Sequence, residues 1–187
     1  MIKLAYWIPL LPLISFFING LGRNKLSKPL IGIIGCISVL ASFAISLLVF
    51  FEVKNGNTGI VKLFDFIAIG KLSIPFSFQI DQLSALFLLI ITGIGSLIHI
   101  YSVAYMNSEE PAHFARYFAY LNLFVFFMLL LVLGSNYVIM FIGWEGVGLC
   151  SYLLIGYWFN PKNGQVKEIG LFSNKGKTQF TPPTSGY

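Results

Sequence analysis

The stretch VIMFIGWEGVGLCSYLLIGYW, residues 138–158, decides the fold class of this chain. It belongs to a longer run, from Tyr117 to Pro161, in which Glu145 is the only formally charged residue. A helix that crosses the hydrocarbon core of a bilayer needs about 20 apolar residues, because each residue advances the helix by about 1.5 Å. The run is long enough for two such helices, and the sequence GSN at 134–136 is the expected break between them.

The composition of the whole chain favours a membrane protein. Of the 187 residues, 57% are hydrophobic and only 10% are charged, and the mean hydropathy is +0.81. Soluble domains carry about 25% charged residues, so this chain has too few polar side chains to cover a globule in water. The net charge of +5 does not indicate nucleic-acid binding, because the basic residues form short clusters between apolar runs.

Charge-free runs predict an all-α membrane protein with five transmembrane helices, since backbone groups in hydrocarbon must be paired within their own segment. The expected helices are about 4–22, 29–52, 82–106, 114–133 and 137–159. We interpret the first as a retained span, because it is longer than a signal-peptide core of roughly 7–15 residues and lacks a cleavage site. Residues 160–187 are polar and rich in Gly, Pro and Lys, which predicts a disordered tail.

A small amphipathic β-hairpin is predicted between the second and third helices, over about 60–81. The segment LSIPFSFQID (72–81) alternates strictly between apolar residues and other residues, a period typical of a strand with one buried face. Gly70 and Lys71 are the expected turn after VKLFDFIAIG. Pro75 cannot donate a backbone hydrogen bond and favours an edge position.

The distribution of Lys and Arg predicts an N-terminus outside and a C-terminus inside, because inner loops carry an excess of these residues. This orientation places eight of them on the inner side: Arg23, Lys25, Lys28, Arg116, Lys162, Lys167, Lys175 and Lys177. Four lie on the outer side: Lys3, Lys54, Lys62 and Lys71. Half of the inner eight belong to the predicted tail.

Glu145 is the first candidate functional residue. Counted from Tyr137, it lies about 12 Å from one end of its predicted helix and about 21 Å from the other. A charge at this depth costs about 2.5–3.5 kcal/mol, so Glu145 must face protein or water, and we expect a cationic partner. The other predicted spans offer no Lys or Arg at that depth. A proton relay is our first hypothesis, and a structural salt bridge or hydrogen-bond tie is the alternative.

The neighbours of Glu145 indicate an interior position. Helical spacing places four residues on its face: Phe141, Gly148, Leu149 and Tyr152. Three glycines, Gly143, Gly146 and Gly148, would let another backbone come close.

His99 is the second candidate, in a stripe of small and polar residues on the third predicted helix. The stripe comprises Thr92, Gly95, Ser96, His99, Ser102 and Met106. It could form one wall of a hydrated path in which His99 titrates. We prefer the alternative, hydrogen bonding between helices. Cys36 and Cys150 lie in apolar segments and are interpreted as small core residues.

Three stretches carry a resemblance to a known family. GWEGVGLCSYLLIGYW (143–158), DQLSALFLLIITGIGSLIHIYSVAYM (81–106) and ARYFAYLNLFVFFMLLLVLGSNYVIMFIGWE (115–145) resemble the L subunit of NADH:quinone oxidoreductase, respiratory complex I. This is the large antiporter-like subunit at the end of the membrane arm. The resemblance covers roughly residues 1–160.

The resemblance implies a proton-translocating membrane subunit in which Glu145 matches the membrane-embedded glutamate of the proton path. In the family this glutamate pairs with a lysine on a later helix. NADH, FMN, iron–sulfur clusters and quinone would be handled by other subunits, so we expect no cofactor in this chain. The expected partners are the other membrane subunits of complex I and the lipid bilayer. We expect the bacterial plasma membrane as the location, rather than the mitochondrial inner membrane.

The chain departs from the family after Asn160 and Pro161, where the family continues into further spans. We therefore expect either a truncated or frameshifted product, or a subunit whose remaining helices another polypeptide supplies. Two alternative functions stay open on this basis. One is a subunit of a cation/proton antiporter, and the other is a structural membrane fragment that conducts nothing.

Overall fold

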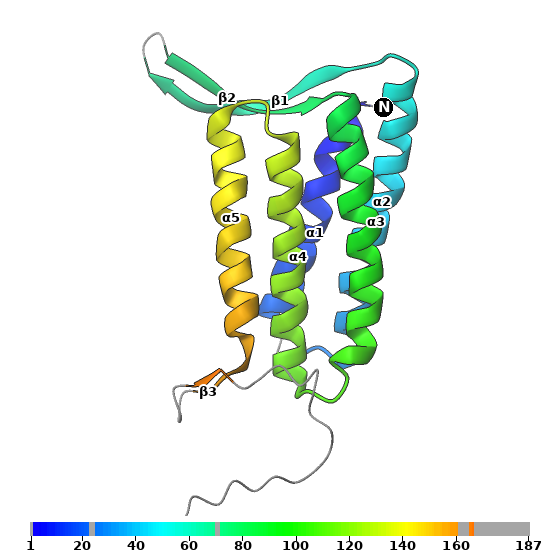
Figure 1. Ribbon diagram of the computed structural model, residues 1–187, viewed down its shortest axis with the longest axis vertical. Helices are drawn as coiled ribbons and strands as arrows, with labels where there is room; N and C mark the ends of the chain where they lie inside the picture. The colour runs from blue at the N-terminus through cyan, green and yellow to red at the C-terminus, as the bar shows by residue number, and fades with distance from the viewer. Residues whose placement is uncertain (1, 23–24, 70–71, 161–164, 167–187) are drawn as a thin grey trace, which may run out of the picture. The chain divides into compact units, whose positions relative to one another are not determined.

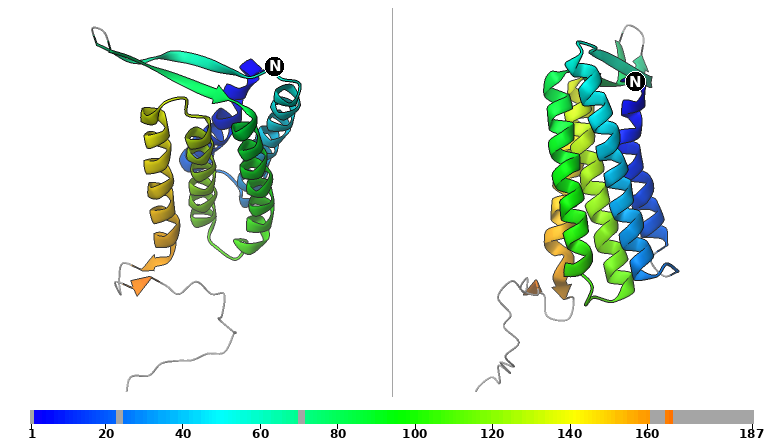
Figure 2. Two further views of the ribbon diagram at one scale, coloured as in Figure 1. Left: turned by 45° about the horizontal axis from the view of Figure 1, so that its top comes forward. Right: turned by 90° about the vertical axis from the view of Figure 1, so that its right-hand side faces the viewer.

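The computed structural model describes residues 2–22, 25–69, 72–160 and 165–166. The chain divides into two units, of which Met1–Ile155 is the first and Gly156–Tyr187 the second. In the first unit, five helices run side by side and a two-stranded hairpin crosses one end of the bundle (Figure 1, Figure 2). Helices that follow one another in the chain run antiparallel (Figure 1).

The first unit contains, in chain order, the 3₁₀ helix η1 (Ile2–Tyr6), α1 (Trp7–Leu21), α2 (Lys28–Lys54), β1 (Gly59–Ile69), β2 (Leu72–Ile80), α3 (Gln82–Tyr105), α4 (Pro111–Leu133) and α5 (Tyr137–Ile155). The second unit, taken by itself, contains the 3₁₀ helix η2 (Gly156–Trp158) and two short strands. These strands, β3 (Phe159–Asn160) and β4 (Gln165–Val166), pair antiparallel.

Five helices of the described residues are long and apolar enough to cross a membrane, which confirms the predicted fold class. Several helix ends differ from the expected bounds by one to four residues, and two of these differences have a clear cause. Helix α4 begins at Pro111, because proline fits the first helical turn, where its missing N–H costs no hydrogen bond. Helix α5 ends at Ile155, before Gly156, where the backbone tightens into η2. Of the predicted tail, only Asn160 and residues 165–166 are described.

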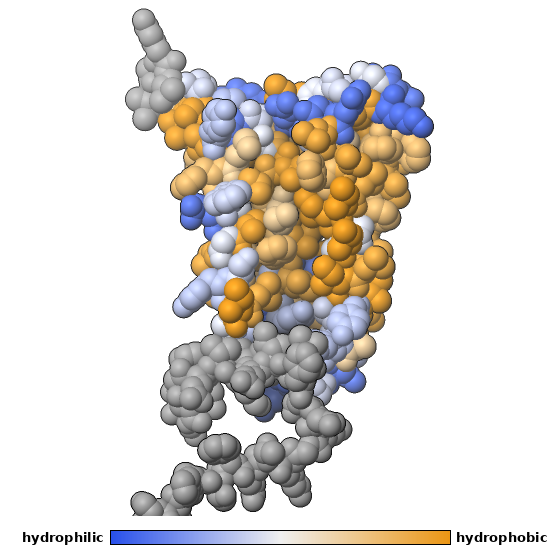
Figure 3. Space-filling view, in the orientation of Figure 1, coloured by the Kyte–Doolittle hydropathy of each residue, from blue (hydrophilic) through white to orange (hydrophobic). Residues whose placement is uncertain are grey.

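The outer surface of the bundle is apolar. Large side chains such as Ile33 and Ile37 on α2 and Leu83 and Leu97 on α3 are exposed. On the face shown in Figure 3, hydrophobic residues cover the middle of the helices, and hydrophilic residues gather at the hairpin end. Hydrocarbon accepts such a surface and water does not, so the protein is a multi-pass integral membrane protein.

The interior contains small and polar residues where the helices meet. Ser38, Ser42 and Ser46 of α2 are buried. A methyl group on Gly35 would lie 2.8 Å from Cδ1 of Phe118, so α2 and α4 approach closely at that point. Small residues at such contacts are typical of membrane helices, which associate by close packing.

The hairpin confirms most of the predicted alternation. Strands β1 and β2 pair antiparallel, and Phe78 and Ile80 are buried while Gln79 is exposed. Ser77 departs from the pattern: it is buried and its hydroxyl bonds to the hydroxyl of Ser135. The reason is that β2 lies against the loop before α5. The predicted turn residues Gly70 and Lys71 lie outside the described residues.

Asp81 links the hairpin to α3 through a capping box. Its carboxylate accepts the backbone N–H of Ser84 at 2.7 Å, and the Ser84 hydroxyl accepts the backbone N–H of Asp81 at 2.8 Å. The bond from the Ser84 N–H lowers the pKa of Asp81 below its usual value. Because both bonds satisfy donors at the helix start, α3 begins directly where β2 ends.

Candidate functional site

Helix α5 packs on α4 through one narrow stripe. The buried residues of α5 are spaced by three and four positions: Ile139, Gly143, Gly146 and Cys150. A methyl group on Gly143 would lie 2.6 Å from the backbone nitrogen of Leu131 on α4. The two helices are therefore in contact at the level of their backbones, as small residues allow.

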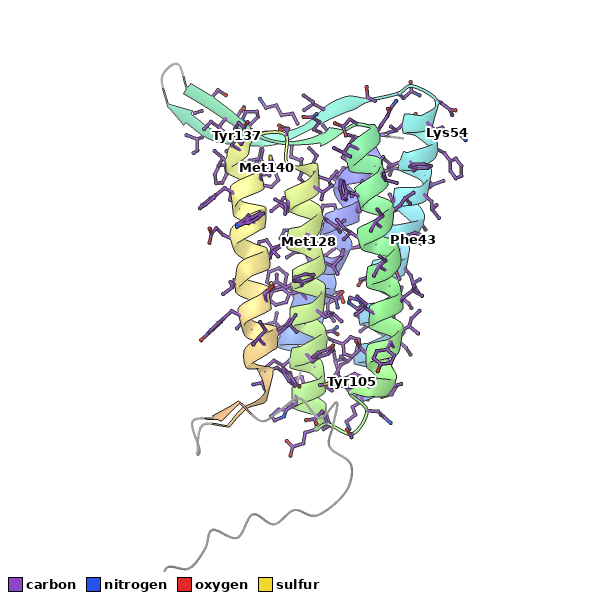
Figure 4. All side chains as sticks on the ribbon, viewed as in Figure 1. Phe43, Lys54, Tyr105, Met128, Tyr137 and Met140 are labelled. Atoms are coloured by element: carbon purple, nitrogen blue, oxygen red, sulfur yellow. The ribbon has the colours of Figure 1, made fainter. Side chains whose placement is uncertain are left out.

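The opposite face of α5 is uncovered by the described residues. Phe141 is 63% exposed, Trp144 68% and Tyr152 75%. Apart from its chain neighbours and the nearby backbone of α5 itself, no described residue has an atom within 4 Å of a methyl group placed on Gly148. Figure 4 shows α5 at the edge of the bundle, with side chains that extend away from α4.

Glu145 lies on this uncovered face, with an exposed side chain. No hydrogen bond or ion pair joins its carboxylate to another described residue, and a partner on another helix stays a prediction. The predicted interior position does not hold within the described bundle, where the Glu145 face is a surface. Because a charge facing hydrocarbon costs about 2.5–3.5 kcal/mol, this face needs a polar or cationic cover in the membrane.

The three glycines near Glu145 differ in their surroundings. Gly143 and Gly146 allow the close approach of α4, as predicted. At Gly148, in contrast, no backbone of another described element comes close, so the approach of a backbone there stays a prediction. The reason is the direction in which each glycine faces around the axis of α5. Gly148 lies on the open face with Glu145, whereas Gly143 and Gly146 lie on the face that packs on α4.

His99 is fully buried in the interior of the bundle. Its Nδ1 lies 2.8 Å from the carbonyl oxygen of Gly95. Since a carbonyl only accepts, Nδ1 carries the hydrogen, and Nε2 is the acceptor of the ring. Nε2 is buried and receives no hydrogen bond from the described residues. The ring of His99 stands edge-on to the ring of Phe118, with a centroid distance of 6.1 Å.

Next to His99, a buried hydrogen bond joins α2 and α4. The Ser38 hydroxyl donates to Oδ1 of Asn122 at 2.9 Å, and Nδ2 of Asn122 donates to the carbonyl oxygen of Phe118 at 2.8 Å. Neither Ser38 nor Asn122 is among the candidate residues predicted from the sequence. The spacing of Ser38, Ser42 and Ser46 by four residues was the available signal for the α2 side of this contact.

The predicted polar stripe of α3 is confirmed as one buried face, but most of its hydrogen bonds stay within the helix. Thr92 and Ser96 donate to the carbonyl oxygens of Leu88 and Thr92, four residues earlier. Among these residues, the hydroxyl of Ser102 makes the side-chain bond between helices, 3.2 Å from the hydroxyl of Tyr117.

A crevice of about 200 Å³ lies between α3 and α4, next to His99. Its walls include Ile94 and Ile98 of α3 and Phe124 and Met128 of α4. Such walls give water few hydrogen-bonding partners, and a buried water needs two to four of them. The geometry therefore favours a packing role for this region over a water-filled path.

No metal site is formed by the described residues: no three His, Cys, Asp or Glu side chains come together within them. Among the charged residues of the described helices, Glu145 is the one that lies far from both ends of its helix. What it can do chemically is accept and release a proton, or pair with a cation from another helix.

The chain is similar in sequence to proteins of a known family. A family model described as the N-terminus of chain 5 of NADH-ubiquinone oxidoreductase (complex I) matches residues 66–118. A second model, described as a putative collagen-binding domain of a collagenase, matches residues 151–187, most of which lie outside the described residues.

Three relatives illustrate the similarity. NADH-ubiquinone oxidoreductase chain 5 of Hypocrea jecorina is 40% identical over 88% of this chain and 24% of its own length. NADH-quinone oxidoreductase subunit L of Rickettsia bellii is 37% identical over 91% of this chain and 26% of its own. A probable intron-encoded endonuclease 4 of Neurospora crassa is 42% identical over 88% of this chain and 30% of its own. The chain thus spans about a quarter of the length of the first two.

Proposed function

Since the chain is a relative of the complex I subunits L and chain 5 over most of its length, we propose that it forms helices of a proton-translocating membrane subunit. In this proposal the subunit belongs to NADH:quinone oxidoreductase and transfers protons across the membrane while electrons flow elsewhere in the complex. Sequence identities of 37% and 40% to two proteins with these names support the proposal.

The single observation that carries the proposal is the placement of Glu145. Its carboxylate lies in the middle of an apolar helix, on a face that the described helices leave open. Ionisable residues inside membranes are rare and typically serve ion pathways or proton relays. We propose that a later helix covers this face and brings a lysine to Glu145, so that the charge of the lysine controls when the carboxylate holds a proton.

For His99 we propose the structural role first. Its Nδ1–H is bound to the carbonyl oxygen of Gly95, and the neighbouring crevice is apolar. The ring then serves to hold α3 against α4 beside Asn122. A titrating role of His99 in a hydrated path stays a prediction.

NADH, FMN, iron–sulfur clusters and quinone would bind to other subunits of complex I, which are the partners of this chain. The bacterial plasma membrane is the proposed location, with the N-terminus outside. In support, Lys25, Lys28 and Arg116 belong to the connections and helix ends opposite the hairpin, which would face the inside (Figure 1).

The test is Glu145→Gln in a complete subunit L that carries residues 1–160 of this chain and is assembled into complex I. The amide keeps the size of the side chain but does not bind and release a proton near neutral pH, so we expect proton transfer through this subunit to slow by about 10²-fold or more. Proton uptake by vesicles, measured with NADH as the electron donor, reports the effect. The matched control is Glu110→Gln, at the polar start of α4, which should pump normally.

The competing functions make different predictions for this variant. Normal proton pumping by a fully assembled Glu145→Gln complex would refute the relay and leave the structural tie. Sodium transport that depends on Glu145 in place of proton transport would favour the cation/proton antiporter.

A further inference from the structure

The contact between α4 and α5 is tightest on either side of Glu145. Gly143 precedes Glu145 by two positions and meets the backbone of Leu131. Gly146 follows it directly, and a methyl group there would overlap the ring of Phe127. These two glycines place α5 against α4 at the depth of the carboxylate.

The upper end of α5 is held by the hairpin. The Asn136 side chain donates to the carbonyl oxygen of Pro75 at 2.8 Å and accepts the backbone N–H of Ile139 at 3.1 Å. The same residue therefore caps α5 and ties it to β2. With its start held by Asn136 and its middle held by the glycines, α5 has little freedom to turn about its axis.

The direction of Glu145 depends on this orientation of α5. Consecutive residues of a helix differ by about 100° in direction, since a turn takes 3.6 residues. With Gly146 facing α4, Glu145 faces the open side. A shift of α5 away from α4 would move the carboxylate with it, because few other contacts of the described residues hold the helix.

We propose that Gly146 and Phe127 are a positioning pair, which sets where the Glu145 carboxylate meets its partner across the open face. This inference rests on the proposed function. It assigns a role to two residues that take no direct part in proton transfer. Glycine at 146 is needed because the Phe127 ring occupies the space that a Cβ atom would take. Phe127 in turn fixes the distance between the helices at this level.

An alanine substitution at Gly146 should be rescued by a second substitution on α4, and one at Gly143 should not. At Gly146 the obstacle is a side chain, and Phe127→Ala removes it. At Gly143 the obstacle includes the nitrogen and Cα of Leu131, at 2.6 and 2.7 Å, which no side-chain substitution removes. A double-mutant cycle separates these cases, because residues in contact show non-additive effects.

The experiment uses the complete subunit in assembled complex I, with variants Gly146→Ala, Phe127→Ala and both together. We expect Gly146→Ala to slow proton pumping by up to about 100-fold, since a misplacement of about 1 Å can have this effect. We also expect a changed pH profile of pumping, and a return of rate and profile in the double variant. Gly20→Ala is the matched control, because the atom nearest to its new methyl group, Cβ of Ala119, lies at 4.0 Å.

A second readout does not depend on pumping. The ¹³C chemical shift of the labelled Glu145 carboxyl group, followed against pH, should change in Gly146→Ala and return to the original curve in the double variant. Gly143→Ala should resist rescue by Leu131→Ala. If Gly146→Ala fails to assemble, a double variant that assembles, pumps and titrates normally supports the pair.

Two results would overturn the inference. One is a Gly146→Ala subunit with an unchanged carboxyl titration and unchanged pumping. The other is a double variant that assembles while its titration stays altered. Failure of the proposed function is a separate outcome, because Glu145→Gln would then pump normally whatever Gly146→Ala does to the titration.

Discussion

Replacing Glu145 by leucine should make this chain more stable when it stands alone in a bilayer. The carboxylate lies on a face that no described helix covers, so in the isolated chain it meets hydrocarbon. Insertion scales assign about 2.5–3.5 kcal/mol to an acidic residue at the centre of a helix and a favourable value to leucine. We therefore expect the free energy of unfolding in lipid bicelles to rise by about 3 kcal/mol.

The same substitution should have the opposite effect on function. In the complete complex, Glu145→Leu should abolish proton transfer through the subunit, because leucine can neither carry a proton nor pair with a cation. The matched control for stability is Glu110→Leu, since Glu110 stands in the polar connection before α4. An isolated Glu145→Leu chain that is less stable than the original would show that Glu145 already has a partner within this chain.

Phe118→Ala should cause the largest loss of stability in the bundle. Phe118 is fully buried. Its ring lies 4.7 Å from that of Phe114 and 6.1 Å from that of His99, and it fills the space next to Gly35 of α2. Truncation of a buried phenylalanine costs about 3–5 kcal/mol, through lost contacts and the cavity that remains. The measurement is equilibrium unfolding in bicelles, followed by tryptophan fluorescence.

Phe17→Ala is the matched control for this prediction. Phe17 lies on α1 and is 52% exposed, so in the membrane its ring contacts lipid, and lipid refills the space after truncation. We expect a cost below about 1 kcal/mol there. Equal losses at Phe118 and Phe17 would contradict the placement of Phe118 at the meeting point of α2, α3 and α4.

The five spans and the hairpin could be predicted because their signals are local. The length of each apolar run sets the number of helices, and the alternation from Leu72 to Asp81 indicates the strand. The helix ends differ where one residue decides the local backbone, as Pro111 does at the start of α4. Ser77 could not be predicted, because its burial depends on Ser135, which is distant in the sequence.

The candidate site was predictable in part for the same reason. Spacing on one helix correctly groups Glu145 with Phe141, Leu149 and Tyr152. Spacing alone does not show whether that face is covered, which depends on the orientation of α5 against α4. The bond between Ser38 and Asn122 joins two helices, and the serine spacing on α2 does not show which residue of another helix Ser38 meets.

The most direct test of the central claim is infrared difference spectroscopy of the assembled complex, compared between rest and NADH-driven turnover. The proposed relay predicts a protonated-carboxyl band that changes during turnover, shifts in heavy water and disappears in Glu145→Gln. The Glu110→Gln complex should keep the band. A spectrum in which the Glu145→Gln complex retains every carboxyl change of the original would contradict the claim that Glu145 carries protons.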